Sequence, residues 1–91
     1  MTRLTLLELT GILRALSHPI RLEIVKKLTN NESSVTELKW YLHRKQSNVS
    51  QHLRVLREKG LVSSKKKGKQ QIYVLNEKYT DLIRYVCKYK V

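Results

Sequence analysis

Apolar residues recur every three or four positions through most of the chain, and this spacing predicts a largely helical protein. Residues 4–16 carry Leu6, Leu9, Leu13 and Leu16 at helical spacing, and Leu4, Leu7 and Ile12 add apolar surface outside that stripe. One buried face does not need so much leucine. A second helix is predicted from about residue 19 to residue 28, because Pro19 fits a first helical turn and the position before it disfavours helix.

A third helix is expected to begin near Ser34, because Ser34 and Glu37 have the spacing of a capping box. A short edge strand over residues 33–35 is an alternative reading of the same segment. After a polar turn at residues 43–45, a fourth helix is predicted from about Ser47 to Lys59, ending at Gly60. Its core stripe consists of Val49, Leu53 and Leu56.

Two β-capable runs, residues 61–66 and 70–75, flank a Gly-bearing turn and predict a β-hairpin. Asn76 can then cap a last helix over residues 77–88. That helix has two apolar faces, one with Tyr79, Leu82, Ile83 and Val86 and the other with Tyr85 and Tyr89.

The predicted fold is mainly α with a small β-hairpin, in the order α-α-α-α-β-β-α. The third helix, the short turn and the fourth helix match the helix-turn-helix motif. At 91 residues the chain is long enough for one core, so we expect a single domain over residues 1–91. No repeat or low-complexity linker divides it.

Net charge is the bulk property of the sequence that says most about its partners. Nineteen Lys and Arg face seven Asp and Glu, for a net charge of +12. Such a positive field attracts polyanions, so the candidate partners are DNA, RNA and an anionic membrane surface. The alternative is that the charged surface is only solvated and binds no partner. Lysines crowd the hairpin tip around Gly68, where a phosphate backbone would relieve their repulsion. A lysine run that protects a strand edge is the alternative.

In a helix-turn-helix, the second helix enters the major groove. Gln51 can pair with adenine and Arg54 with guanine, while Ser47 and Asn48 at the helix start can bind a phosphate together with free N–H groups. An ordinary amphipathic surface helix is the alternative. The candidate DNA-binding residues are Ser47, Asn48, Ser50, Gln51, Arg54 and Arg57 in the recognition helix, Arg44, Lys45 and Gln46 in the turn, and Lys65, Lys66, Lys67 and Lys69 in the hairpin.

Residues 46–62 resemble the signature of the ArsR-type family of winged-helix repressors, roughly Ser-x-x-Ser-x-His-Leu-x-x-Leu-x-x-x-Gly-Leu-Val. Residues 16–25 are similar to the family's Leu-x-x-Pro-x-Arg-Leu-x-Ile-Leu segment. The resemblance implies a winged helix-turn-helix that forms a homodimer through its first and last helices and reads an inverted repeat. The expected dimer interface comprises Leu6, Leu9, Leu13, Leu82, Tyr85, Val86 and Tyr89.

Many members of this family sense metals, but this sequence lacks the residues that bind the metal in them. The cysteine positions of one sensing site are Ser34 and Thr36, whose hydroxyls do not replace thiolates for a soft metal. The last helix has Asp81 but no His for the second site. We therefore expect no metal and no cofactor.

The lone Cys87 excludes an internal disulfide and a zinc site with several cysteines. It could join its mate across a two-fold axis if their Cα atoms come within about 7 Å, or be a small buried hydrophobe. His52 is expected to pack or make a local hydrogen bond, His18 to start a helix, and His43 to lie in the turn, where it could touch phosphate.

The sequence contains no Gly-rich phosphate loop and no catalytic Ser-His-Asp or Cys-His set, so we expect that the protein is not an enzyme. No apolar run approaches 18 residues and no signal peptide is recognisable, so we expect a cytoplasmic protein associated with nucleoid or viral DNA. The leading hypothesis is a dimeric, sequence-specific double-stranded DNA-binding repressor, with activation left open. The alternatives are a weakly specific architectural protein that coats nucleic acid and a protein-interaction module that has lost DNA binding.

Overall fold

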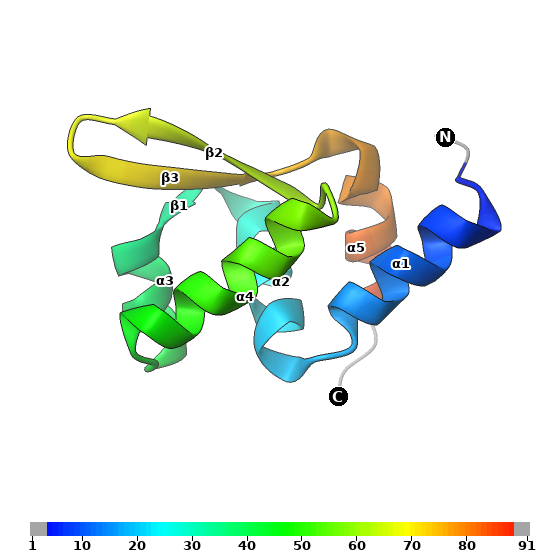
Figure 1. The fold of residues 1–91 in the computed structure, drawn as a ribbon, viewed down its shortest axis with the longest axis horizontal. Coiled ribbons are helices and arrows are strands. Elements are labelled where there is room, and N and C mark those ends of the chain that lie inside the picture. The colour runs from blue at the N-terminus through cyan, green and yellow to red at the C-terminus, as the bar shows by residue number, and fades with distance from the viewer. Residues whose placement is uncertain (1–3, 89–91) are drawn as a thin grey trace.

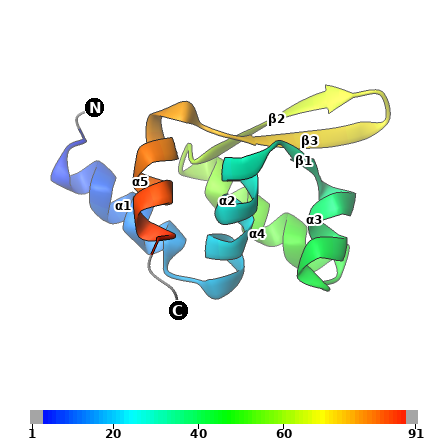
Figure 2. The same ribbon diagram turned by 180° about the vertical axis from the view of Figure 1, so that it is seen from behind.

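The described part of the chain, residues 4–88 of a computed structural model, combines helices with one small sheet (Figure 1). Figure 1 and Figure 2 place the hairpin tip and the start of α4 at one end of the molecule, and α1 and α5 at the other. The elements are α1 (Leu6–Leu16), α2 (Pro19–Asn30), β1 (Ser33–Ser34), α3 (Val35–Leu42), α4 (Gln46–Glu58), β2 (Val62–Lys67), β3 (Gln70–Leu75), the 3₁₀ helix η1 (Glu77–Tyr79) and α5 (Thr80–Val86).

Helix α1 begins two residues later than predicted because Thr5 caps it. The Thr5 hydroxyl accepts the Glu8 N–H at 3.1 Å, and the Glu8 carboxylate accepts the Thr5 N–H at 3.3 Å. The core face of α1 consists of Ile12, Ala15 and Leu16. Most of the predicted leucine stripe therefore lies away from the core of its own chain.

Both features predicted for the segment before α3 are present, but the strand is one residue shorter than expected, because Val35 already belongs to α3. Ser33 and Ser34 pair with β3, and Ser34 also caps α3, accepting the Glu37 N–H at 3.0 Å. The Glu37 carboxylate accepts the Ser34 N–H at 3.0 Å in return. The predicted hairpin thus becomes part of a three-stranded antiparallel sheet in the order β1-β3-β2.

The hairpin turns at Gly68 and Lys69, between the paired residues Lys67 and Gln70. Gly68 has a φ of +64°, the left-handed region that the first position of a type II′ turn requires. Gly60 at the end of α4 has a φ of +74°, as expected for a glycine that stops a helix.

The prediction of one last helix over residues 77–88 is wrong in detail. The segment starts as η1, in which the Asn76 side chain accepts the Lys78 N–H at 3.0 Å and the Asn76 carbonyl accepts the Tyr79 N–H at 3.0 Å. These short-range bonds tighten the first turn into a 3₁₀ helix. Helix α5 follows and ends at Val86.

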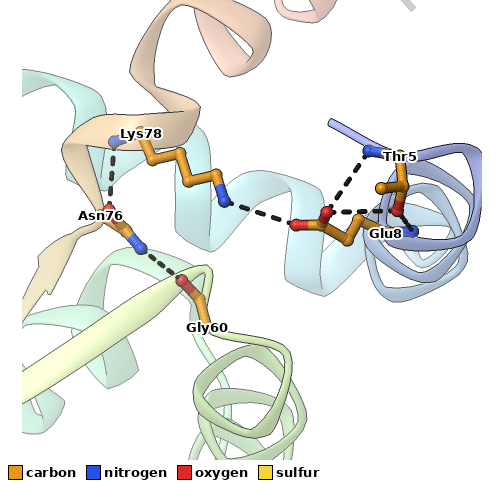
Figure 3. A network of polar contacts seen from close by, with 5 residues as sticks. All are labelled: Thr5, Glu8, Gly60, Asn76 and Lys78. Atoms are coloured by element: carbon orange, nitrogen blue, oxygen red, sulfur yellow. Dashed lines mark hydrogen bonds and ion pairs between the residues drawn. The ribbon is translucent and has the colours of Figure 1, made fainter. Parts of the chain in front are cut away.

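A chain of polar contacts joins α1, η1 and the end of α4 (Figure 3). The Asn76 side-chain amide donates to the Gly60 carbonyl at 2.8 Å. Lys78 Nζ lies 3.4 Å from Glu8 Oε2, and Glu8 in turn holds Thr5. The helices at one end of the molecule are thereby connected to the point where the chain leaves α4 for the hairpin.

One hydrophobic cluster contains side chains from all five α-helices and from the hairpin. Ile24, Leu38, Leu53, Leu56 and Ile83 are fully buried at its centre. Burial of each such side chain stabilises the fold by roughly 1.5–3 kcal/mol relative to exposure. This core fixes α4 against α2 and α3.

Candidate nucleic-acid interface

A tight turn connects α3 to α4. His43 has a φ of 53°, and its N–H donates to the Trp40 carbonyl at 3.3 Å. The Arg44 N–H donates to the Lys39 carbonyl at 3.2 Å. His43 and Arg44 are exposed, and the short turn sets α4 at an angle to α3, as in a helix-turn-helix.

Helix α4 has one fully buried face and one exposed polar face. Val49, Leu53 and Leu56 are each 0% exposed, so the predicted core stripe is confirmed. Gln46 was expected in the turn, but it is the first residue of α4, because Lys45 occupies the N-cap position. The exposed face presents Ser47, Ser50, Gln51, Arg54 and Arg57.

The exposed face of α4 contains an ion pair between two of its own residues. Arg54 forms an ion pair with Glu58 at 3.1 Å, and both side chains are mostly exposed. Exposed pairs of this kind contribute only about 0.3–0.5 kcal/mol, so a partner can displace Glu58 from Arg54. Sequence reasoning did not foresee that Glu58 would compete with a DNA base for Arg54.

An open hollow of about 480 Å³ lies where the turn meets the start of α4. Lys45 makes no side-chain cap, so the first N–H groups of the helix are available to a ligand. Asn48 is half-buried, and its Oδ1 is buried with no hydrogen-bond partner among the described residues. The hollow is lined by His43, Arg44, Lys45, Ser47, Asn48 and Gln51.

The hairpin of β2 and β3, here called the wing, carries the predicted lysines. Lys65, Lys66, Lys67 and Lys69 are all exposed. Lys65 is paired with Glu32 at 3.2 Å, a contact that links the wing to the loop before β1 and that sequence reasoning missed. Within residues 4–88, Lys66, Lys67 and Lys69 have no carboxylate within ion-pair distance.

Two histidines take the roles that their positions predicted. His18 caps α2, accepting the Ile20 N–H on Nδ1 at 3.1 Å. His52 is half-buried on α4, with Nδ1 3.5 Å from Arg21 Nη1. Burial first, and then the neighbouring His18, Arg21 and Arg44, lower the pKa of His52. The direct ring contact between His18 and His52 was not foreseen.

The candidate dimer surface lies on α1 and α5. Leu6 is 81% exposed, Leu13 46% and Tyr85 59%, while Leu9, Leu82 and Val86 are half-buried. Tyr89 lies outside the described residues. Leu7, which is next to Leu6 but is not part of the predicted set, is also exposed, at 84%. An apolar surface of this kind favours a protein partner.

Cys87 packs at the edge of the core, and burial raises the pKa of its thiol. The small-hydrophobe reading accords with this position. Ser34 is used as a helix cap, and Thr36 and Asp81 are exposed. Residues 4–88 contain no group of three or more His, Cys, Asp or Glu that could hold a metal, and no helix there is long and apolar enough to cross a membrane.

Comparison with known proteins gives these features a context. Residues 18–64 match the family model described as "Bacterial regulatory protein, arsR family". The chain is 43% identical over 70 residues to the "Biofilm growth-associated repressor" of Xylella fastidiosa, an alignment that covers 77% of this chain and 61% of that protein. The chain therefore spans less than two thirds of this relative's length.

Solved structures agree with the fold. Reduced HlyU from Vibrio cholerae, named a transcriptional activator, has a TM-score of 0.85 at 34% identity, with 90% of this chain and 87% of that chain covered. A fragment of Mb0332 from Mycobacterium bovis, described as a homodimeric winged helix-turn-helix DNA-binding domain, has a TM-score of 0.85 at 25% identity, with 91% and 78% covered. The family and these relatives are regulators, which confirms the expectation of no enzyme. The chain folds as a winged helix-turn-helix and belongs to the arsR family of bacterial regulatory proteins.

Proposed function

We propose that the protein is a sequence-specific, double-stranded DNA-binding transcriptional regulator that represses as a homodimer on an inverted-repeat operator. The observation that carries this proposal is the division of α4 into a fully buried stripe and an exposed polar face, next to a basic hollow and a lysine-tipped wing. A major groove accepts such a helix, and its base edges match the amide and guanidinium groups on that face.

The exposed residues divide by role. Gln51 and Arg54 suit base edges, because both can form bidentate hydrogen bonds. The hollow at the start of α4 suits a backbone phosphate, because it combines basic side chains with free helical N–H groups. The wing lysines and Arg57 suit flanking phosphates, which supply affinity and register rather than sequence information.

The homodimer is supported by the leucines of α1, which expose apolar area on the end opposite the wing. The Mycobacterium bovis neighbour is described as homodimeric. A two-fold pair would place two copies of α4 about one DNA turn apart. We place the protein with its DNA in the cytoplasm, and we predict that no metal is required.

The experiment that tests the proposal selects bound sequences from a random duplex pool at about 0.15 M salt, a physiological ionic strength. A recovered inverted repeat with half-sites about one helical turn apart supports it. Recovery of no consensus, with binding that disappears as salt rises, favours the coating protein instead. Absence of binding at low salt as well would favour the interaction module.

A double variant, Gln51→Ala with Arg54→Ala, extends the test. We expect it to lose the preference for the selected duplex, because each bidentate base contact contributes about 1–3 kcal/mol of discrimination. Lys26→Ala is the charge control, because Lys26 is exposed on α2 near Cys87, which follows α5, rather than on the polar face of α4. Equal preference in the double variant and the wild type would contradict these assignments.

A further inference from the structure

Two imidazoles meet where the recognition helix α4 packs on the start of α2. The His18 and His52 ring centroids are 4.3 Å apart, with the ring planes inclined at 46°. His18 lies in the connection between α1 and α2, whereas His52 lies on α4. The contact therefore joins a helix proposed to read DNA to the connection that follows the helix proposed to form the dimer.

Both rings use a nitrogen as a hydrogen-bond acceptor. The Ile20 N–H donates to His18 Nδ1 at 3.1 Å. Arg21 Nη1 lies 3.5 Å from His52 Nδ1, and a guanidinium can only donate, so His52 Nδ1 is the acceptor. An imidazole nitrogen that accepts carries no proton, so these contacts require both rings in the neutral form.

Arg21 extends the arrangement to α1. Its Nε donates to the Ala15 carbonyl in the last turn of α1, while Nη1 reaches His52 on α4. The planar guanidinium therefore bridges α1 and α4.

We propose that His18, Arg21 and His52 form a clamp that holds α4 in its DNA-reading position relative to α1, and that mild acid opens this clamp and weakens sequence-specific binding. The inference rests on the proposed function, whose regulation it describes. None of the three residues needs to touch DNA, so they act as positioning residues.

Protonation of His52 changes its contact with Arg21 from attraction to repulsion. A protonated ring has donors on both nitrogens, so His52 would turn an N–H toward the Arg21 guanidinium. The titratable and charged groups that face His52 are His18 from the connection before α2, Arg21 from α2 and Arg44 from the turn before α4, and none of them is acidic.

The sign of the pH effect follows from His52. Burial and its basic neighbours hold the pKa of His52 below its ordinary value of 6.5, so the folded chain binds this proton less readily than the unfolded chain. The stabilisation is complete above about pH 6.5 and is lost as the pH falls below it. Glu8 and Glu37 have pKa values below the ordinary carboxyl value, and Cys87 has one above the ordinary thiol value, so these groups keep their charge state in this window.

Non-specific binding should respond in the opposite direction. Added protons increase the positive charge of the protein, which strengthens attraction to any phosphate backbone. The measured quantity is therefore the ratio of affinities for the selected duplex and for a scrambled duplex of equal length and composition. We expect this ratio to fall about tenfold between about pH 7.5 and pH 5.5, as linkage predicts when binding requires the release of protons.

The decisive variant is His18→Asn with His52→Gln. Asn retains a side-chain oxygen for capping α2, and Gln retains an acceptor for Arg21, but neither takes up a proton. We expect a ratio that stays constant over the same pH range. Lys26→Ala is the control, because it changes an exposed side chain of α2 outside both the clamp and the proposed DNA-binding surface, and its ratio should fall as in the wild type.

A second readout needs no DNA. The thermal unfolding midpoint of the wild type should fall between about pH 7.5 and pH 5.5 more than that of the double variant. Should the variant not fold, NMR titration of the wild-type ring protons should show His52 titrating below about pH 6.5 together with shifts of the Ala15 and Arg21 signals. A ratio that is high at pH 7.5 and independent of pH, or a His52 titration that leaves Ala15 and Arg21 unmoved, overturns the clamp. A ratio near one already at pH 7.5 overturns the proposed function instead.

Discussion

The Asn76 side chain donates a hydrogen bond to the Gly60 carbonyl at 2.8 Å, which joins the end of the wing to the end of the recognition helix. Its oxygen simultaneously accepts the Lys78 N–H at 3.0 Å. Asn76 thus joins the chain segment before β2 to the segment after β3. This position makes Asn76 a sensitive point in the attachment of the wing to α4.

We expect Asn76→Ala to reduce the free energy of unfolding by about 1–2 kcal/mol, because it removes two hydrogen bonds of a partly buried residue. Asn76→Asp is the matched variant. It retains the oxygen that caps η1 but cannot donate to Gly60, so it separates the two contributions. Denaturant unfolding measures both, and a decrease below a few tenths of a kcal/mol in Asn76→Ala would refute the role assigned to these bonds.

Glu58 is the acidic residue on the exposed side of α4 and holds Arg54 at 3.1 Å. We expect Glu58→Gln to tighten DNA binding about three- to fivefold in a dimer, because each released exposed pair contributes about 0.3–0.5 kcal/mol. Titration of the selected duplex in a mobility-shift assay measures this change. Weaker binding by Glu58→Gln would show instead that the pair positions Arg54.

Lys67 extends from the wing tip and has no ion-pair partner in the described part of the chain. We expect Lys67→Ala to lower affinity for all duplexes alike and to reduce the slope of log K against log salt by about 0.9 for each phosphate that the variant no longer neutralises. Lys26→Ala removes the same charge from α2 and should leave the slope nearly unchanged. Equal slopes in the two variants would argue that the wing lysines are only solvated.

Leu6 and Leu7 are adjacent on α1 and almost equally exposed, at 81% and 84%, but only Leu6 belongs to the predicted interface. We expect Leu6→Lys to weaken dimerisation by about 10²–10⁴-fold, because a two-fold interface loses two buried leucines at roughly 1.5–3 kcal/mol each. Leu7→Lys should have a much smaller effect. Sedimentation over a concentration series decides, and a dimer that survives Leu6→Lys would place the interface elsewhere.

The capping box of α3 gives an acid-dependent stability. The Ser34 N–H, followed by the Ser34 hydroxyl and Lys27, holds the pKa of Glu37 below its ordinary value of 4.5. The contribution is therefore present above about pH 4.5 and is lost as the pH falls through the lower, folded value. We expect Glu37→Gln to be less stable than the wild type at about pH 7 and to approach it at about pH 3. A stability difference that is unchanged by acid would exclude this carboxylate as the source.

Much of the fold could be predicted because its signals are local. The buried stripe of Val49, Leu53 and Leu56 follows from spacing alone, and Gly60 marks the end of α4 by its backbone freedom. The division of the last segment into η1 and α5 could not be predicted, because a 3₁₀ turn and an α-helical turn share similar apolar patterns. Only the hydrogen bonds of Asn76 distinguish them.

The missed parts of the candidate site depend on contacts between distant residues. His18 and His52 were each assigned a role from their neighbours in sequence, but their ring contact depends on how α4 packs against α2. The same holds for Lys65 and Glu32, which meet because β3 pairs with β2 on one side and with β1 on the other. No periodicity along the chain records such pairs.

Strand β3 lies between β2 and the two-residue β1, and β1 ends at the residue that caps α3. Backbone hydrogen bonds therefore connect the wing directly to the start of the helix-turn-helix, and no flexible linker separates them. The wing and the two helices should move as one rigid unit, which fixes the distance between the two points at which they contact a duplex.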